Sequence, residues 1–141
     1  MKINKFKNRD LLFSAIAKTI HQKLSHAIDK SKSASFIVPG GTTPAPAFKL
    51  LSKSNLDWKK VSIAQSDERW LEATHKQSNE RLTRENLLIN NAKFSNYISM
   101  KNHAMNIEDG KQICENAYSA IPNPFTVCML GMALDGLIWL H

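Results

Sequence analysis

Apolar residues recur at intervals of about one helical turn in the first part of the chain. The stripe consists of Leu12, Ile16, Ile20, Leu24 and Ile28, and Phe13 and Ala17 widen it. This spacing matches the period of about 3.6 residues of a helix with one apolar face. The pattern therefore predicts an amphipathic helix that is capped near Asn8 or Asp10.

Shorter apolar runs follow, and they alternate with further helical patterns. Runs rich in β-branched and aromatic residues predict strands over residues 36–38, 61–64, 97–100 and 125–132. Helical spacing predicts helices over residues 44–51, 78–89 and 107–121. The last strand, FTVCMLGM, is apolar throughout, which is typical of a strand that is covered on both faces of a sheet. Strands that alternate with helices indicate an α/β fold, so we expect a Rossmann-like parallel sheet with flanking helices in one domain over residues 1–141.

Some of these elements carry more detailed predictions. Thr43 is the expected N-cap of the helix over 44–51, with Pro44 at its first position. In the helix over 107–121 the spacing directs four side chains inward, namely Ile113, Ala117, Tyr118 and Ile121. Cys114 and Cys128 show no zinc-binding spacing, and both are expected to be reduced and buried.

The composition adds a basic charge balance. The formal net charge is +7, which suits an anionic partner such as a phosphate ester, a nucleic acid or a membrane surface. The lysines are scattered as on an ordinary solvated surface, so neither a nucleic acid nor a membrane is an expected partner. The histidines lack metal-ligand spacing, which predicts no metal site. No stretch has the length of a membrane span or the plan of a signal peptide, and we therefore expect a soluble, cytoplasmic protein.

Three loops follow the ends of predicted strands, which is where open α/β sheets bind ligands. In PGGTTP, two glycines let the backbone approach an anion and two threonine hydroxyls can donate to phosphate oxygens. These residues are Gly40, Gly41, Thr42 and Thr43. The alternative interpretation of this loop is a tight turn with an ordinary helix cap.

The second and third loops carry charged residues. In SDERW, Arg69 can hold a phosphate through two parallel hydrogen bonds. The alternative is a local ion-pair cluster of Arg69 with Asp67 and Glu68. In GMALDG, Asp135 stands between small residues.

In this order, and at the ends of successive strands, the three loops resemble the motifs of the 6-phosphogluconolactonase family. The first motif is matched by Gly40, Gly41, Thr42, Thr43 and Pro44, and the second by Asp67, Glu68, Arg69, His75, Ser78 and Asn79. The third is matched by Leu130, Gly131, Met132, Asp135 and Gly136. The resemblance extends from the first helix to Gly136.

The resemblance implies hydrolysis of 6-phospho-glucono-1,5-lactone to 6-phosphogluconate, a step of the oxidative pentose phosphate pathway, without metal or organic cofactor. The expected ligand is thus a phosphorylated sugar lactone. The residues that the resemblance assigns to its phosphate are Gly40, Gly41, Thr42, Thr43 and Arg69. It places Asp67, Glu68, Asn79 and Gly136 in the loops of the substrate site, and it gives Asp135 a supporting catalytic role.

The sequence departs from the family pattern at the third motif. The family has a histidine after Asp-Gly, where it activates water, but this chain has Leu137, which cannot accept a proton. Beyond this point the family continues with more strands and helices. We therefore interpret residues 137–141 as an aberrant tail and the chain as truncated and inactive. A frameshift near codon 136 or 137 is one hypothesis, because a second reading frame of LIWLH permits His-x-Ala-Ser-Leu, as in the family.

Two alternatives to an inactive lactonase relative stay open. One is a sugar-phosphate isomerase of the glucosamine-6-phosphate deaminase type, although Arg69 and the Ser-Asn pair at 78–79 favour the lactonase. The other is a non-catalytic remnant that binds phosphosugars. In a chain cut after the last strand, residues 125–132 are expected to form an edge or half-covered strand that exposes apolar surface and unpaired backbone groups. Such a chain is expected to be marginally stable or prone to aggregate.

Overall fold

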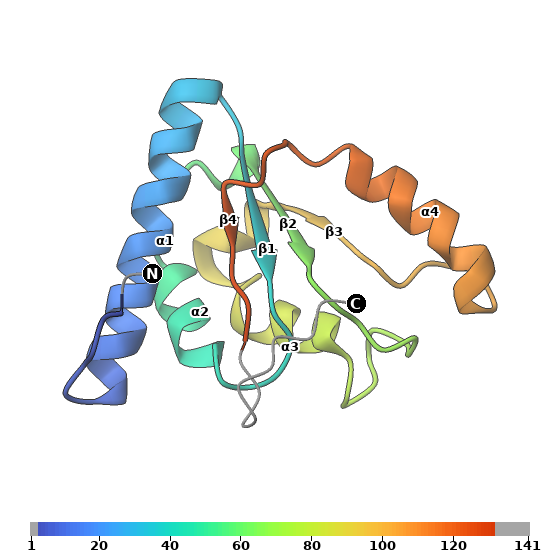
Figure 1. Ribbon diagram of the computed structural model, residues 1–141, viewed down its shortest axis with the longest axis horizontal. Helices are drawn as coiled ribbons and strands as arrows, with labels where there is room; N and C mark the ends of the chain where they lie inside the picture. Colours follow the sequence, from blue (N-terminus) through green and yellow to red (C-terminus); the bar gives the residue numbers. More distant parts are fainter. Residues whose placement is uncertain (1–2, 132–141) are drawn as a thin grey trace.

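The computed structural model describes residues 3–131, in which strands alternate with helices along most of the chain (Figure 1). The predictions for Asp135, Gly136, Leu137 and the tail over 137–141 lie outside the described residues. The helices are α1 (Arg9–Ser31), α2 (Ala45–Leu51), α3 (Asn79–Asn86) and α4 (Ile107–Ser119). The strands are β1 (Ala34–Val38), β2 (Val61–Gln65), β3 (Asn96–Ile98) and β4 (Val127–Cys128). None of the helices within residues 3–131 combines the length and the apolarity that crossing a bilayer requires.

Helix α1 confirms the prediction from the first apolar stripe. It begins after Asn8, whose side chain accepts a hydrogen bond from the Leu11 N–H at 2.9 Å, so Asn8 rather than Asp10 is the cap. The helix ends at Lys32, which adopts a left-handed conformation with φ of 64°. The buried residues of its inner face are Ala17, Ile20, Leu24 and Ile28.

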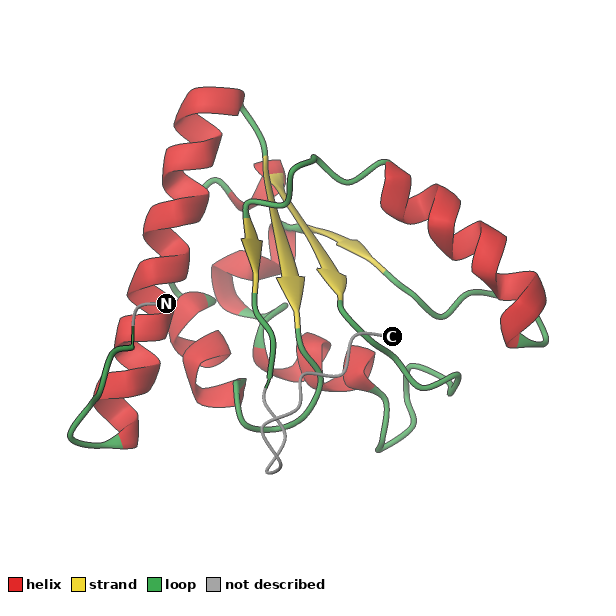
Figure 2. Ribbon diagram, viewed as in Figure 1, coloured by secondary structure: helices red, strands yellow, loops and turns green. Residues whose placement is uncertain are grey.

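The four strands form one parallel sheet in the order β3-β2-β1-β4 (Figure 2). All five residues of β1 are buried, because β1 lies between two other strands and both of its faces are covered. The predicted α/β class and the parallel sheet are confirmed. The predicted strands over 36–38, 61–64 and 97–100 are found with bounds shifted by two residues or fewer.

Helices cover the two faces of the sheet unequally. On one face, α1, α2 and the segment after α3 enclose the main core, to which Leu24, Phe36, Leu51, Ile63 and Leu87 contribute. On the other face a smaller cluster joins the sheet residues Ile37 and Ala64 to Ile121, which follows α4. In Figure 1, α1 and α4 accordingly lie on opposite sides of the strands. The predicted α/β layering is therefore complete on one face and sparse on the other.

Four predictions about the second half of the described chain are wrong in detail. The helix expected over 78–89 ends at Asn86. Ile113 is not inward-facing, because α4 meets the sheet mainly near its C-terminal end and leaves Ile113 exposed. The strand expected over 125–132 pairs over only two residues and is not covered on both faces. Cys128 is exposed rather than buried, and the other thiol, Cys114, is half-buried.

The expectation of an edge or half-covered strand in this region is confirmed. Within residues 3–131, β4 has β1 as its one neighbour in the sheet. Phe125 and Leu130, which flank β4, are 43% and 40% exposed. Within the described residues, this apolar strand is therefore only partly covered.

Candidate functional site

The carboxyl ends of β1 and β2 bring the first two candidate loops together. The strand register pairs Val38 with Gln65, and the Ser66 N–H continues the ladder by donating to the Val38 carbonyl at 2.9 Å. Because the two strands are parallel, their loops leave the sheet at the same edge. This edge is at the lower side of Figure 1, where the chain continues from β1 to α2 and from β2 to α3.

The glycine turn after β1 packs against the first residue of α3. A Cβ atom at position 40 would lie 2.2 Å from the Nδ2 atom of Asn79, so only glycine fits there. Gly41 adopts φ of +81°, in the left-handed region that glycine favours, and has open space around it. The turn thus needs its two glycines for different reasons, close packing at 40 and backbone conformation at 41.

The expected side-chain cap of α2 is absent, so the prediction for Thr43 is wrong. Pro44 precedes the helix with helical backbone angles, and the Ala45 N–H donates to the Thr42 carbonyl at 3.2 Å. The proline fixes φ near its helical value, so this backbone turn can start α2 without a hydroxyl acceptor. The side chains of Thr42 and Thr43 are exposed at the mouth of the turn and remain accessible to a ligand.

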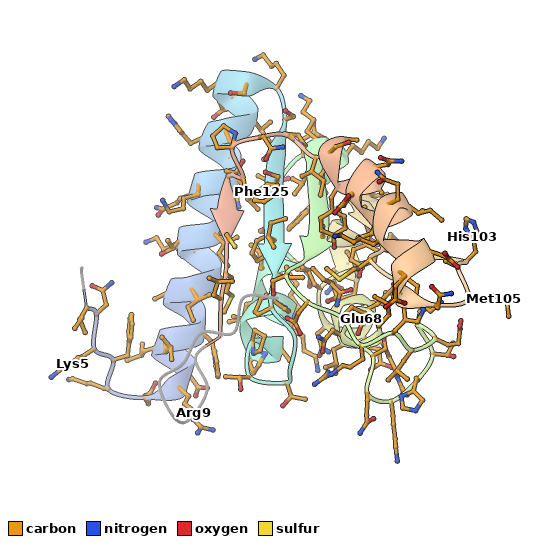
Figure 3. The ribbon with its side chains drawn as sticks, turned by 45° about the vertical axis from the view of Figure 1, so that its right-hand side comes forward. Lys5, Arg9, Glu68, His103, Met105 and Phe125 are labelled. Atoms are coloured by element: carbon orange, nitrogen blue, oxygen red, sulfur yellow. The ribbon has the colours of Figure 1, made fainter. Side chains whose placement is uncertain are left out.

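Three of the four hydrogen bonds to Glu68 come from the beginning of α3. Its Oε1 atom accepts hydrogen bonds from the N–H groups of Arg69 at 2.7 Å and Asn79 at 2.9 Å. Its Oε2 atom accepts from the Glu80 N–H at 2.7 Å and the Ser78 hydroxyl at 3.0 Å. A carboxylate at this place satisfies N–H groups that have no partner within the helix and interacts favourably with the helix dipole. Glu68 therefore fixes the loop to α3, and it lies inside this cluster of side chains in Figure 3.

Asn79 links the remaining residues of the second motif. Its Nδ2 atom donates to the carbonyl of Asp67 at 3.1 Å and to Asp67 Oδ2 at 2.9 Å. Its Oδ1 atom accepts from Arg69 Nη1 at 2.7 Å, and Nη1 also donates to the Gln77 carbonyl at 3.0 Å. Asn79 is only 1% exposed, so this amide is a rigid support for a guanidinium group that itself reaches the surface.

Arg69 forms no ion pair with any of the residues that the structure describes. The alternative interpretation, a local ion-pair cluster with Asp67 and Glu68, is thus not what forms. The carboxylate of Glu68 is taken up by α3, and that of Asp67 accepts from Ser66 and Asn79. The two oriented hydrogen bonds of Arg69 both use Nη1, which leaves the opposite side of the planar guanidinium available for an anion.

Two half-buried tyrosines hold the end of β2. The hydroxyl of Tyr118, on α4, donates to the Gln65 carbonyl at 3.0 Å and accepts from the Gln65 N–H at 3.2 Å. The hydroxyl of Tyr97, on β3, donates to Gln65 Oε1 at 2.8 Å. Burial is the main cause that raises the pKa of both phenols, so both stay protonated and can donate. These bonds fix the residue just before the Arg69 loop.

A cavity of about 730 Å³ lies between this loop, the sheet and α4, with Ile37, Arg69, Trp70, Tyr118 and Phe125 among its lining residues. Trp70 forms part of its wall. The Lys101 ammonium lies 4.6 Å from the centre of the Trp70 ring, and a Cβ atom at position 110 would lie 2.1 Å from the ring. The indole thus contacts both a cation and the backbone of α4. Burial also raises the pKa of the Cys114 thiol in the same wall.

The structure brings together five of the predicted site residues, namely Gly40, Asp67, Glu68, Arg69 and Asn79. Gly41, Thr42 and Thr43 lie in the adjoining turn. His75 stays within its own loop, where its Nδ1 atom accepts from the Gln77 N–H at 3.1 Å. The contact between Trp70 and Gly110 is not among the predicted features, although a glycine inside a helical pattern is a signal of close packing. Among residues 3–131 there is no group of acidic, histidine and cysteine side chains that could hold a metal ion.

Comparison with known proteins yields one family. A family model described as glucosamine-6-phosphate isomerases/6-phosphogluconolactonase matches residues 7–138. A 6-phosphogluconolactonase of Mesorhizobium japonicum is 36% identical over 133 residues, which cover 94% of this chain and 56% of the relative. One of Rhizobium meliloti is 34% identical over 93% of this chain and 56% of the relative. The chain thus spans about half the length of the curated relatives that it matches.

Solved structures agree with these relatives. A 6-phosphogluconolactonase from Shewanella baltica matches with a TM-score of 0.91 and 40% identity, over 94% of this chain and 57% of that one. A monomeric glucosamine-6-phosphate deaminase matches with a TM-score of 0.79 but only 16% identity, which shows a shared fold alone.

Proposed function

Because this chain belongs to the family of glucosamine-6-phosphate isomerases and 6-phosphogluconolactonases, we propose that it provides the phosphate-binding part of a 6-phosphogluconolactonase site. The ligand is 6-phospho-glucono-1,5-lactone or its hydrolysis product, 6-phosphogluconate. The observation that carries this proposal is the state of Arg69, whose guanidinium is oriented by Asn79, exposed, and free of ion pairs within the described residues.

The geometry around Arg69 suits a phosphate group. The free side of the guanidinium can donate two parallel hydrogen bonds to phosphate oxygens. The turn at Gly40 and Gly41 comes from the neighbouring strand end, and its two exposed threonines offer further donors. Asp67 and Glu68 do not compete for the cation, because their carboxylates accept hydrogen bonds from other groups. In this proposal these acidic residues shape the site rather than touch the ligand.

Binding and hydrolysis are separate in the proposal. Opening a lactone needs a water molecule and a nearby group that accepts its proton. Where the family has a histidine for this role, the sequence of this chain has Leu137, directly after Asp135 and Gly136. We therefore expect the 141-residue chain to bind 6-phosphogluconate without accelerating hydrolysis of the lactone.

The lactonase is favoured over the deaminase by the hydrogen bonds of the second motif. Ser78 and Asn79 both bind Glu68, and Asn79 also binds Arg69, so the Asp-Glu-Arg and Ser-Asn segments act as one unit. Both curated relatives above that share more than 30% of their residues with the chain are named 6-phosphogluconolactonases. The deaminase alternative predicts release of ammonia from glucosamine 6-phosphate, which a coupled assay would detect.

Calorimetric titration with 6-phosphogluconate and with gluconate tests the proposal. We expect the phosphorylated ligand alone to bind, and Arg69→Gln to weaken binding roughly 10- to 100-fold, because a lost charge-assisted hydrogen bond costs about 1.5–3 kcal/mol. Arg9→Gln is the matched control. It makes the same change in charge at the start of α1, which Figure 3 shows on the other side of the molecule from Glu68.

Two outcomes would contradict the proposal. One is equal affinity for gluconate and 6-phosphogluconate, since the phosphate would then contribute nothing. The other is an equal loss of affinity in the Arg69 and Arg9 variants, which would reduce the effect to net charge. Hydrolysis of the lactone by the unmodified chain would refute the expectation that the chain binds without catalysing, but it would leave the phosphate site untouched.

A further inference from the structure

Positive charge gathers where the first three strands begin, at the edge of the sheet opposite the candidate site. This edge is at the upper side of Figure 1. The segments that lead into β1, β2 and β3 are residues 29–33, 53–60 and 90–95, and we call them the basic edge. Its exposed lysines are Lys30, Lys32, Lys53, Lys59, Lys60 and Lys93. Asp29 and Asp57 are its acidic residues, so the basic edge carries a formal net charge of +4.

The sheet register and a hydrogen bond bring the three segments together. The first residues of β1 and β2 are paired, and the first residue of β3 is paired with the second of β2. Neighbouring strands are about 4.8 Å apart, so the residues before them lie side by side. The Asn91 side chain donates to the Lys53 carbonyl at 3.1 Å, which joins the third segment to the second. Lysines that are spread over the sequence are thus neighbours on one surface.

Local structure explains only part of this charge. The C-terminal end of a helix favours cations, and Lys30 and Lys32 lie at that end of α1. The other lysines lie in or beside two short 3-10 helices, η1 (Trp58–Lys60) and η2 (Asn90–Phe94), whose dipoles are small. Within residues 3–131, Lys60 is the one lysine of the basic edge with an ion pair, to Asp57 at 3.1 Å. The charge of the other five is therefore available to an external anion.

Lys32 occupies a position that suits glycine better. It ends α1 in the left-handed conformation, with φ of 64°, which costs a residue with a side chain about 1 kcal/mol. Its ammonium donates to the Asp29 carbonyl at 3.1 Å and so stays at the surface beside the end of α1. Unfavourable backbone conformations of this kind are frequent at functional sites. The chain thus keeps a cation at the basic edge at some cost in stability.

An exposed aromatic ring lies among these lysines. Phe94 is 57% exposed, and the Lys93 ammonium lies 5.1 Å from the centre of its ring. Single-stranded nucleic acids bind to surfaces of this composition, because cations hold their phosphates and aromatic side chains stack on their bases. An acidic protein segment would use the charge but not the ring. The combination therefore favours a nucleic acid over an acidic protein.

We propose that the basic edge binds single-stranded nucleic acid, with its lysines on the phosphates and Phe94 stacked on a base. The sequence predicts no nucleic-acid partner, because its lysines are scattered along the chain. The fold brings six of them to one edge, which the sequence pattern does not contain. This surface lies at the other end of the strands from Arg69, so the proposal does not depend on the phosphosugar site.

Fluorescence polarisation of a labelled oligouridylate of about 12 nucleotides tests the charge of the basic edge. For single strands, the logarithm of the association constant falls with the logarithm of the salt concentration, with a slope of about −0.7 per phosphate contact. We expect a slope of about −3.5, which corresponds to about five contacts. A triple variant with Lys53→Gln, Lys59→Gln and Lys93→Gln should reduce it to about −1.4.

The matched control removes the same charge elsewhere. It combines Lys5→Gln, Lys7→Gln and Lys18→Gln, three exposed lysines before α1 and in its first half. Figure 3 shows Lys5 beside the beginning of α1, away from the basic edge. The control should keep the slope of the unmodified chain, and neither triple variant should alter the affinity for 6-phosphogluconate. Failure of this surface and failure of the phosphosugar site are therefore distinguishable.

A second variant tests the stacking. Phe94→Ala should weaken oligouridylate binding roughly 5- to 100-fold and leave the salt slope unchanged, because no charge is lost. Phe6→Ala is its control, since Phe6 is 41% exposed but lies before α1, and it should have no effect. An oligothymidylate of the same length identifies the source of the ligand. Equal affinity means that RNA and DNA both bind, and a preference for oligouridylate means that RNA is the ligand.

Four results would overturn the proposal. The first is no binding of either oligonucleotide at low salt. The second is an equal fall of the salt slope in the two triple variants, which would reduce the effect to net charge. The third is loss of oligonucleotide binding in Arg69→Gln, which would place the oligonucleotide in the phosphosugar site. The fourth is unchanged affinity in Phe94→Ala together with equally tight binding of polyglutamate, which would make an acidic protein segment the partner.

Discussion

The contact between Gly40 and Asn79 provides a sharp test of how the glycine turn supports Arg69. In Gly40→Ala the new Cβ atom would lie 2.2 Å from Asn79 Nδ2 and 2.5 Å from both Cγ and Oδ1. Non-bonded heavy atoms prefer separations of about 3.5 Å or more, so the amide would have to move by about 1 Å. The three hydrogen bonds of this amide, at 2.7, 2.9 and 3.1 Å, could not survive that shift.

The expected cost follows from these contacts. Overpacking a tight site costs about 1–3 kcal/mol, and the lost hydrogen bonds to Arg69 and Asp67 add to it. We therefore expect Gly40→Ala to lower the free energy of unfolding by about 3 kcal/mol. Asn79→Ala removes the obstructing atoms and should cost about 2–3 kcal/mol by itself. In the Asn79→Ala background the three atoms nearest to the added Cβ are gone, so Gly40→Ala should then cost less than about 1 kcal/mol.

Urea unfolding followed by circular dichroism measures this coupling in a double-mutant cycle. Gly41→Ala is the control, because its cost of about 1–2 kcal/mol arises from the positive φ and should be the same in both backgrounds. If Gly40→Ala alone does not fold, a folded Gly40→Ala/Asn79→Ala variant still demonstrates the coupling. Equal costs of Gly40→Ala in the two backgrounds would refute the packing argument.

Three further predictions concern the neighbourhood of the site. Glu68→Gln should lower the free energy of unfolding by about 2 kcal/mol, because one amide oxygen cannot accept the four hydrogen bonds of the carboxylate. The exposed control Glu85→Gln should cost less than about 0.5 kcal/mol. Urea unfolding of the two variants measures both values. Gly110→Ala should destabilise the chain by about 1–3 kcal/mol and change the tryptophan fluorescence, because the new Cβ atom would overlap Trp70. This is expected although alanine is the better helix former. An unchanged emission spectrum and an unchanged urea midpoint would contradict it. Burial raises the pKa of both tyrosines of the chain above the ordinary 10.0, so the unfolded state loses their protons first. The free energy of unfolding therefore falls as pH rises above 10. Tyrosinate absorbance should then appear together with the loss of circular dichroism and not before it.

The sequence predicts those parts of the fold that depend on local signals. The period of the apolar stripe and the asparagine before it are sufficient for α1 and its cap. The α/β class follows in the same way from the alternation of strands and helices. Thr43 fails as a cap because Pro44 starts α2 by its backbone alone, and residue type does not distinguish these two ways of beginning a helix.

The interior positions of α4 and β4 could not be predicted, because they depend on how closely these elements lie to the sheet. Helical spacing gives the apolar face of α4, but α4 meets the sheet mainly near its C-terminal end, and Ile113 is exposed. In β4 the apolar sequence is typical of a covered strand, whereas within residues 3–131 Cys128 lies at the edge of the sheet. Whether a residue is buried depends on the elements that pack against it, and the sequence pattern of one element carries no information about those elements.

In the candidate site, too, the sequence predicts some features and not others. The motifs predict which loops meet, because parallel strands end at one edge, and Gly40, Arg69 and Asn79 do lie together. The motifs do not predict which side chains face a ligand. The motif places Glu68 in the substrate-site loop, yet three of the four hydrogen bonds to its carboxylate come from the start of α3. These bonds span ten or more residues and are visible only in the structure.

The central claim is that Arg69, oriented by Asn79, binds the phosphate of a phosphosugar. Its most direct test is nuclear magnetic resonance of the arginine Nε–Hε groups, with the Arg69 signal assigned by its absence in Arg69→Gln. We expect this signal to shift and saturate on addition of 6-phosphogluconate and not of gluconate, and the response to be lost in Asn79→Ala. An Arg69 signal that does not move while the ligand binds, or that moves equally with gluconate, would contradict the claim.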